Sequence, residues 1–338
     1  MTPVTVRGPV TARQRPVPWP RLAWVAWRQH RAALAGAAAL LGAAALVMLV
    51  NGLAMRATSS SLGLNRCHPV TSSACAAQLS LFNDDYQRWQ GYLLGGLQAV
   101  PVLAGVFTGG PLLARELETG TFRFAWTQGS GRLRWVVAKL VLPGLTVTAA
   151  AAAFSLMFAW WYRPLAAEGR SLLQPNTFDL AGVAFPAWTL AAFALGVLAG
   201  VLIRRVVPAM AAAIGVWAGL AVATPFYLRP RYQAPVVIPA LRPDQHPIPS
   251  GAWTTDSWWT YPGGGRMPDS AVLHLIGRLQ SAGLDVKSWV TSHHYGEGLA
   301  YQPAARFWHF QLIEGGWLLA LALILSAAAV WVVCRRSA

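Results

Sequence analysis

The sequence predicts an all-α integral membrane protein with six transmembrane helices and an external subdomain between the fifth and sixth spans. Charged residues make up only 12% of the 338 residues, whereas soluble domains carry about 25%. Hydrophobic residues make up 55%, so the chain lacks the charge that would cover a soluble protein of this size. With 31 Gly, 23 Pro and 3 Cys, the composition also excludes the collagen-like, disordered and disulfide-scaffold classes.

Six uncharged, apolar stretches account for the missing charge. Each is about as long as the roughly 20 residues that an α-helix needs to cross the hydrocarbon core. They contain no Asp, Glu or His, which disfavours an ion-coupled carrier, and Glu314 is expected just outside the last of them. The predicted spans are residues 32–55, 92–114, 140–162, 181–203, 206–228 and 316–334.

Basic residues are distributed unequally on the two sides of these spans. The side that holds both termini and the connections 115–139 and 204–205 has a net charge of +13, and the other side has +2. Since Lys and Arg concentrate on the cytoplasmic side, we expect both termini in the cytoplasm. The net charge of +15 therefore indicates orientation in a lipid bilayer and not binding of nucleic acid.

These spans divide the chain into four parts. Residues 1–31 form a cytoplasmic N-terminal segment, in which 21–31 is either a short interfacial helix or a basic anchor. Residues 32–228 hold five transmembrane helices. Residues 229–311 form an extracellular subdomain, with a helix at 269–283 that buries Val272, Leu273, Ile276 and Leu279. Residues 312–338 form the sixth helix and a short tail.

Two cysteines lie in the predicted external loop 56–91. Cys67 and Cys75 face the oxidising side of the membrane, where either a disulfide or two free thiols are compatible with the sequence. In the fourth span, Gly196 and Gly200 form a GxxxG step that predicts close packing against another helix.

Motifs for several chemistries are absent. Neither Lys139 nor Lys287 follows a glycine, so the chain has no P-loop and cannot itself be an ATPase of that class. It has no HExxH and no GxSxG sequence. The adjacent His293 and His294 have no ligand-spaced partners, and we interpret them as exposed or packing residues and not as metal ligands. We therefore predict no catalytic, cofactor-binding or metal-binding residue on this chain.

The connection 115–139 carries the most specific pattern. Glu118 stands shortly before Gly120-Thr121, and after a turn Arg132 precedes Lys139 by seven residues. This pattern resembles the first cytoplasmic loop of ABC exporter permeases of the type-2 class, which export drugs, lipids and polysaccharides. The segments 125–128 and 301–314 are similar to an actinobacterial branch of that family. One departure is Gly129, where the family usually has proline.

The resemblance implies a function, partners and a site. It implies a permease subunit that moves a hydrophobic or amphipathic substrate (drug, antibiotic, lipid or peptide) outward. It would act with a second permease subunit, in a homodimer or heterodimer, and with a separate cytoplasmic ABC ATPase that holds ATP and Mg. The plasma membrane of a high-GC actinobacterium would be its location. The ATPase-coupling loop would use Glu116, Glu118, Gly120, Thr121, Arg123, Arg132, Arg134 and Lys139.

The residues of this loop fit a coupling role. Gly120 can end a helix and Thr121 can cap the next one, which would delimit a short, rigid, charged lever. An ordinary positively charged cytoplasmic loop is the alternative. For the whole chain, two other functions stay open: a membrane-embedded lipid-processing enzyme, which needs paired acids near the interface, and a sensory protein that binds an extracellular ligand.

Overall fold

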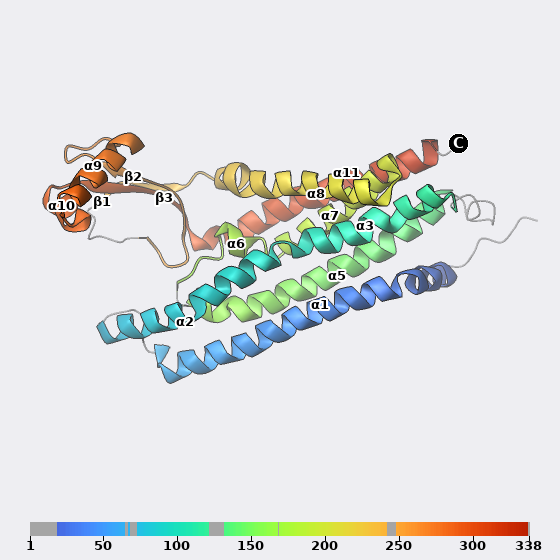
Figure 1. Ribbon diagram of the computed structural model, residues 1–338, viewed down its shortest axis with the longest axis horizontal. Helices are drawn as coiled ribbons and strands as arrows, with labels where there is room; N and C mark the ends of the chain where they lie inside the picture. Colours follow the sequence, from blue (N-terminus) through green and yellow to red (C-terminus); the bar gives the residue numbers. More distant parts are fainter. Residues whose placement is uncertain are drawn as a thin grey trace, which may run out of the picture.

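The computed structural model describes residues 19–64, 67, 73–121, 132–167, 169–241 and 248–336. Long helices lie side by side in a bundle, and a smaller subdomain projects from one end of it (Figure 1). The first and last helices begin and finish at the same end, which we call the terminal end. The opposite end, which carries the subdomain, is the subdomain end.

Six stretches in the described part of the chain are long and apolar enough to cross a membrane, which confirms the predicted class. They are Gly42–Ser61, Gly91–Thr119, Leu133–Ala167, Ala184–Ile203, Val206–Arg231 and Ala304–Arg335. The bundle is built from α1 (Trp19–Ser61), α2 (Ser73–Leu97), α3 (Val100–Thr119), α5 (Arg132–Ala167), α6 (Pro175–Phe178), α7 (Ala184–Ile203), α8 (Val206–Ala223), the π-helical η2 (Thr224–Leu228), the 3-10 helix η3 (Arg229–Arg231) and α11 (Phe307–Arg336).

The first helix begins well before the first predicted span. α1 starts at Trp19 and continues without interruption to Ser61, so the segment 21–31 is helical and continuous with the span. That this segment lies in the membrane interface stays a prediction.

The second span is interrupted where the sequence predicts one continuous helix. α2 ends at Leu97 and α3 begins at Val100, with Pro101 in the first turn of α3. Proline has no backbone N–H to continue the ladder of an earlier helix, so it suits the first turn of a new one. Gln98, between the two helices, donates its side-chain amide to the carbonyl of Asn176 (2.9 Å), which joins this break to the connection between α5 and α7.

The last helix begins earlier than predicted. α11 starts at Phe307, and the apolar stretch that contains it runs over Ala304–Arg335. The expectation that Glu314 lies outside the last span is therefore wrong. The charge does not end the helix because Glu314 is fully buried and paired with Arg229 (Oε1–Nη2 2.7 Å), as described below.

Small residues bring α3 and α7 into close contact, as the GxxxG step predicts. A Cβ atom at Gly196 would lie 2.8 Å from the backbone nitrogen of Gly110, and one at Gly200 would lie 2.7 Å from its carbonyl oxygen. On the facing side, a Cβ at Gly109 would lie 2.3 Å from the carbonyl oxygen of Phe193. Close backbone approach of this kind is a main source of helix association in lipid. The glycines on both helices therefore make α3 and α7 a tightly packed pair.

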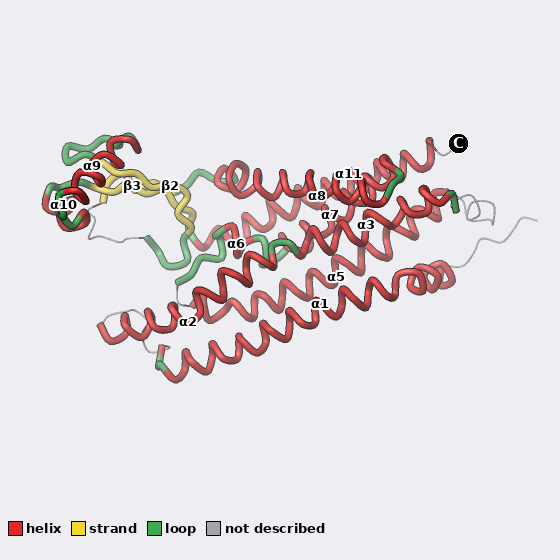
Figure 2. The backbone as a smooth tube through the Cα atoms, viewed as in Figure 1, coloured by secondary structure: helices red, strands yellow, loops and turns green. Residues whose placement is uncertain are grey.

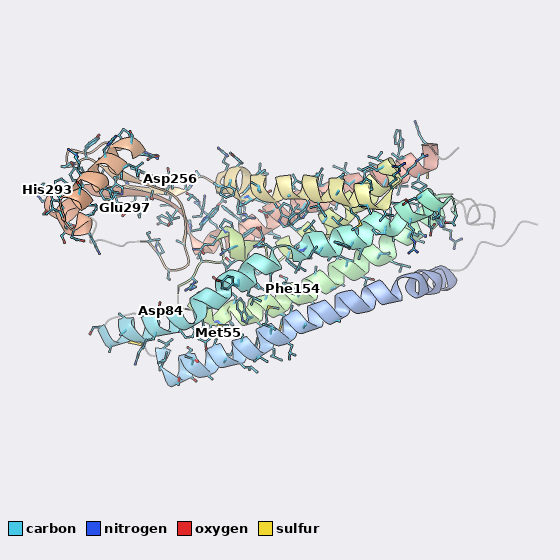
Figure 3. All side chains as sticks on the ribbon, in the orientation of Figure 1. Met55, Asp84, Phe154, Asp256, His293 and Glu297 are labelled. Atoms are coloured by element: carbon cyan, nitrogen blue, oxygen red, sulfur yellow. A yellow bond between two sulfur atoms is a disulfide. The ribbon has the colours of Figure 1, made fainter. Side chains whose placement is uncertain are left out.

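On the other side of the bundle, α1 packs against α5. Met55 of α1 and Phe154 of α5 lie on facing helices (Figure 3) and belong to one buried apolar cluster. Beyond the end of α1, Cys67 forms a disulfide with Cys75 of α2, with a Cα–Cα distance of 5.5 Å. The disulfide ties the segment after α1 to the first turns of α2. The alternative of two free thiols is thus not what the structure shows.

The subdomain contains a small sheet that the sequence analysis did not predict (Figure 2). β1 (Val236–Leu241), β3 (Gly296–Gln302) and β2 (Trp253–Thr260) form an antiparallel sheet in that order. Two helices, α9 (Asp269–Ser281) and α10 (Val286–Ser292), accompany it.

α9 falls in the predicted region but turns a different face inward. Leu275 and Leu279 are buried, Val272 and Ile276 are half-buried, and Leu273, predicted to be buried, is exposed. The buried leucines pack with Met267 in a small apolar core of the subdomain. Val272, Ile276 and Leu279 keep the predicted helical spacing, so the error concerns the orientation of the helix and not its existence.

Candidate functional site

The predicted coupling loop leaves the bundle at the terminal end, where α3 finishes. Gly120 follows the last residue of α3 with φ of 72°, in the left-handed region that glycine adopts at low cost. The hydroxyl of Thr119 donates to the carbonyl of Arg115 (2.9 Å) and contacts the hydroxyl of Thr121 (3.0 Å). Gly120 therefore ends α3 as predicted, and the exposed Thr121 lies directly beyond it.

An ion pair closes the loop at its base. The ammonium group of Lys139 on α5 contacts the Glu116 carboxylate on α3, and both side chains are mostly buried. The same ammonium group lies 4.9 Å from the centre of the Trp135 ring. Below it, Leu113, Val136 and residues of α7 and α11 form a buried apolar cluster. The ion pair thus joins α3 to α5 at the two ends of the predicted loop, next to this apolar cluster.

Glu118 makes the contact that the sequence does not reveal. Its Oε2 accepts a hydrogen bond from the backbone N–H of Val206, the first residue of α8 (3.2 Å). α7 and α8 are joined only by Arg204, in the left-handed conformation with φ of 57°, and Arg205. The first N–H groups of a helix lack partners within the helix and attract negative charge, so a carboxylate from α3 caps α8.

The remaining predicted residues lie around these contacts or outside the described part of the chain. Arg132 is the first residue of α5, and Arg134, two residues later in the same helix turn, is half-buried. The side chain of Arg132, and all of Arg123, lie outside the described residues. The structure thus brings Glu116, Glu118 and Lys139 together with the α7–α8 turn.

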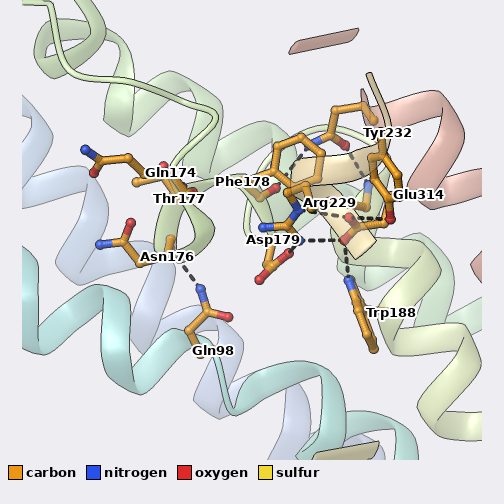
Figure 4. A network of polar contacts seen from close by, with 12 residues as sticks. Gln98, Gln174, Asn176, Thr177, Phe178, Asp179, Trp188, Arg229, Tyr232 and Glu314 are labelled. Carbon is orange, nitrogen blue, oxygen red and sulfur yellow. Dashed lines mark hydrogen bonds and ion pairs between the residues drawn. The ribbon is translucent and has the colours of Figure 1, made fainter. Parts of the chain in front are cut away.

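A second polar cluster, which the sequence analysis missed, lies at the subdomain end (Figure 4). Arg229 of η3 and Glu314 of α11 are both completely buried. Arg229 forms a fork with both carboxylate oxygens of Glu314, through Nε to Oε2 (2.9 Å) and Nη2 to Oε1 (2.7 Å). The guanidinium carbon lies 4.2 Å from the centre of the Phe178 ring. Two-point pairing of this kind is the strongest arrangement available to arginine and a carboxylate.

Two further donors complete the coordination of Glu314. The indole N–H of Trp188 on α7 donates to Oε1 (2.9 Å), and the hydroxyl of Tyr232 donates to Oε2 (3.2 Å). Trp317 in turn donates its indole N–H to the Tyr232 oxygen (2.9 Å). Each oxygen of Glu314 therefore accepts two hydrogen bonds. The cluster joins α7, η3 and α11 at the point where the subdomain leaves the bundle.

Asp179 brings a second carboxylate to the same arginine. It follows α6 directly, its side chain is 19% exposed, and its Oδ1 contacts Arg229 Nη2. Burial raises the pKa of Asp179, the positive charge of Arg229 lowers it, and the negative charge of Glu314 raises it; together they bring the pKa to about 7. The cluster thus contains two acids and one base.

Comparison with known proteins decides the family. Residues 38–229 match the family model described as ABC-2 membrane transporter related, which is more than half of the chain. The chain belongs to this family. The comparisons with curated proteins and with solved structures found no match.

The matched region of this ABC-2 type permease contains one polar site completely and the other in part. It covers the terminal-end contacts of Glu116, Glu118 and Lys139, and it ends at Arg229. Glu314 and the sheet subdomain follow the matched region. Within the described residues, no group of three or more His, Cys, Asp or Glu side chains is arranged to hold a metal ion.

One pattern in the sequence of the permease could have revealed the second cluster. Gln311, Glu314 and Trp317 stand three residues apart, so they follow one face of an otherwise apolar helix. Gln311 accepts from the N–H of Ala184 (2.8 Å) and donates to the carbonyl of Phe178 (3.0 Å). A polar stripe on an apolar membrane helix indicates a buried network. The predicted span starts at residue 316, after Gln311 and Glu314, and this late start concealed the network.

Proposed function

We propose that the permease is the membrane-spanning subunit of an ATP-driven ABC exporter, which moves a hydrophobic or amphipathic substrate outward. ATP and Mg would be held by a separate cytoplasmic ATPase, and a second permease subunit would complete the membrane part. The family supports the transporter class. The observation that carries the coupling role is the contact from Glu118 on α3 to the first residue of α8.

This contact makes the terminal end a suitable surface for a partner that moves. The end of α3, the start of α5 and the α7–α8 turn meet there through Glu116, Lys139 and Glu118. A push on the loop between α3 and α5 would reach α8 through Glu118 and reach α7 through the glycine contacts of α3. ATP-driven closure of an ATPase pair would supply that push. The terminal end would then be cytoplasmic, as the distribution of basic residues predicts.

The two alternative functions find less support. A lipid-processing enzyme needs accessible acids near the interface, and Glu314 has no exposed surface and accepts four hydrogen bonds. It cannot reach a lipid without losing these bonds. A sensory role would rest on the subdomain alone, whereas the family match covers the bundle. Both alternatives predict that charge changes at the terminal end leave function unaffected.

The decisive experiment tests association with the ATPase. The permease is co-expressed with candidate cytoplasmic ABC ATPases from the same organism, and the complex is purified through a tag on the permease. We expect Glu118→Lys to lose at least about tenfold in ATPase recovery, which corresponds to about 1.4 kcal/mol, while its amount in the membrane stays unchanged. Asp84→Lys, which reverses an exposed charge on α2, is the matched control. Equal recovery with Glu118→Lys and with wild type would exclude the coupling role.

Transport itself needs a second measurement. The complex is reconstituted in liposomes, and ATP hydrolysis is measured with a panel of amphipathic drugs, antibiotics and lipids. Stimulation by one class identifies the substrate class. Accumulation of that compound on the side opposite the ATPase establishes export, and accumulation on the same side would contradict it.

A further inference from the structure

The polar cluster at the subdomain end has an excess of negative charge. Arg229 and Glu314 neutralise each other through the two-point fork, and every oxygen of Glu314 is occupied. Asp179 adds a second carboxylate to the same guanidinium group. With all three groups ionised, the cluster carries one uncompensated negative charge in a mostly buried place, which is costly. A proton on one carboxylate removes that cost.

The surroundings indicate which carboxylate takes the proton. Among the described residues, the charged groups that act on Asp179 are Arg229 of η3 and Glu314 of α11. Of the neighbouring elements, α7 contributes the indole of Trp188, and the segment after η3 contributes Tyr232, whose hydroxyl faces Glu314. The two oxygens of Glu314 already accept four hydrogen bonds, from Arg229, Trp188 and Tyr232. Asp179 has one such bond to Arg229 and an exposed edge through which a proton can arrive from water.

We propose that Asp179 is a proton-binding site, and that the bound proton keeps the subdomain ends of η3 and α11 joined. The reaction is the transfer of one proton from water to the carboxylate of Asp179, which turns −COO⁻ into −COOH. The protonated group keeps its carbonyl oxygen as an acceptor for Arg229. The buried cluster then has no net charge, and the fork between Arg229 and Glu314 is undisturbed.

Loss of the proton has a mechanical consequence. The new negative charge on Asp179 repels Glu314 and competes with it for Arg229 Nη2, which contacts both acids. Arg229 directly follows the π-helix η2, whose wider turn replaces regular α-helical bonding, a local feature often found at functional sites. The joint between η3 and α11 therefore weakens when Asp179 ionises. Under the proposed function this joint would be a gate at the outer end of the bundle, but the proton site does not depend on ATP.

The first experiment detects the proton. Infrared difference spectra of the purified permease in lipid nanodiscs follow the C=O stretch of protonated carboxyl groups as the pH changes. We expect a band that titrates with a midpoint near pH 7 and is absent in Asp179→Asn. Asp256→Asn, which removes an exposed carboxylate of the subdomain paired with Arg266 (3.2 Å), should leave the band unchanged.

The second experiment measures the distance between η2 and α11 as the pH changes. Spin labels are attached to Phe226→Cys on η2 and Leu312→Cys on α11, two exposed positions, after Cys334→Ser removes the free thiol. We expect the distance distribution to broaden as the pH rises through about 7 in the chain with Asp179, and to stay narrow in Asp179→Asn, which imitates the protonated acid.

Three results would overturn the proposal. The first is a wild-type spectrum without a titrating carboxyl band between about pH 5 and pH 9, which needs no variant. The second is a band that disappears in Glu314→Gln and persists in Asp179→Asn. The third is a label distance that does not respond to pH. All three measurements use the permease without ATP or ATPase, so their failure is independent of the coupling role at the terminal end.

Discussion

The two polar sites lie at opposite ends of the same bundle and differ in their contact with solvent. At the terminal end, Glu118 and Thr121 are exposed, and Glu118 reaches the backbone of α8 by one hydrogen bond. At the subdomain end, Arg229 and Glu314 have no exposed surface and share a two-point fork. One site therefore has its charge at the surface of the protein, and the other has most of its charge paired inside it.

Because of this difference, substitutions at one end should affect the association with a partner and substitutions at the other end the stability of the fold. Exposed ion pairs and hydrogen bonds contribute about 0–1 kcal/mol to folding, so residues at the terminal end can be used for recognition at little cost. Breaking a buried pair leaves an uncompensated charge and costs several times more. Substitutions at the two ends should thus give opposite results: loss of association without loss of stability at one end, and the reverse at the other.

The largest effect is expected from Arg229→Met. This substitution removes from Glu314 and Asp179 the arginine that, among the described residues, pairs with both. The free energy of unfolding should fall by about 3–5 kcal/mol, measured by SDS-induced unfolding in mixed micelles. Arg231→Met is the matched control, because Arg231 is exposed and donates to the carbonyl of Tyr227 (2.5 Å). Equal stability of the two variants would mean that the fork is not structural.

A smaller loss is expected between the two ends, where α3 packs on α7. In Gly109→Ala, the new methyl group would lie 2.3 Å from the carbonyl oxygen of Phe193. The helices must separate, at a cost of about 1–3 kcal/mol. Gly215→Ala on α8 meets no atom within 4 Å and should be neutral or slightly stabilising. If Gly109→Ala also weakens ATPase recovery, the α3–α7 contact transmits between the ends.

The pH dependence of stability tests the subdomain end alone. Asp179 has a pKa of about 7 in the folded protein and 3.8 as its ordinary value, so the folded protein holds the proton more tightly. The resulting stability is complete below about pH 4 and is lost as the pH rises towards 7. Between about pH 5 and pH 7 the free energy of unfolding should fall by about 2 kcal/mol.

Subtracting the same curve for Asp179→Asn isolates this group from the other acids of the chain. A difference that stays constant over the range would show that Asp179 has an ordinary pKa. A difference that grows towards high pH would mean that Asp179 is stabilised as the anion, which reverses the expected sign.

Much of the bundle follows from the sequence because lipid imposes one simple condition. Six uncharged stretches must be helices, since no other open structure satisfies the backbone in the membrane, and Gly196 and Gly200 could be assigned to a close contact. The errors lie where a charged residue predicts the end of a membrane-spanning helix. The sequence predicts Glu314 outside the last span, yet its pairing with Arg229 allows α11 to include it. Pairing is a property of the folded chain, so the boundary was not predictable from α11 alone.

The two polar sites were predictable to different degrees, because the sequence relates residues that lie close together in the chain but not residues that only the fold brings together. Glu116, Gly120 and Lys139 lie within one short loop pattern, and the structure brings Glu116 and Lys139 together. Asp179, Arg229 and Glu314 are separated by 50 and 85 residues, and nothing local relates them. In the subdomain, helical spacing located α9 but could not orient it, because Leu273 and Leu275 are equally apolar and only the sheet determines which is buried.

The smallest effect on stability is expected from Glu118→Ala, and this variant tests the contrast most directly. The substitution removes one exposed hydrogen bond to the first N–H of α8, and water can replace the lost acceptor. The free energy of unfolding should change by less than about 1 kcal/mol, as in the control Asp84→Ala at an exposed position of α2, while ATPase recovery falls only for Glu118→Ala. A loss of stability as large as that of Arg229→Met would show that the cap on α8 is itself structural. The terminal end would then resemble the subdomain end, and reduced ATPase recovery could be explained by a misfolded surface. A stable variant with reduced recovery leaves recognition as the explanation, because the carboxylate that caps α8 would then be needed by the partner and not by the fold.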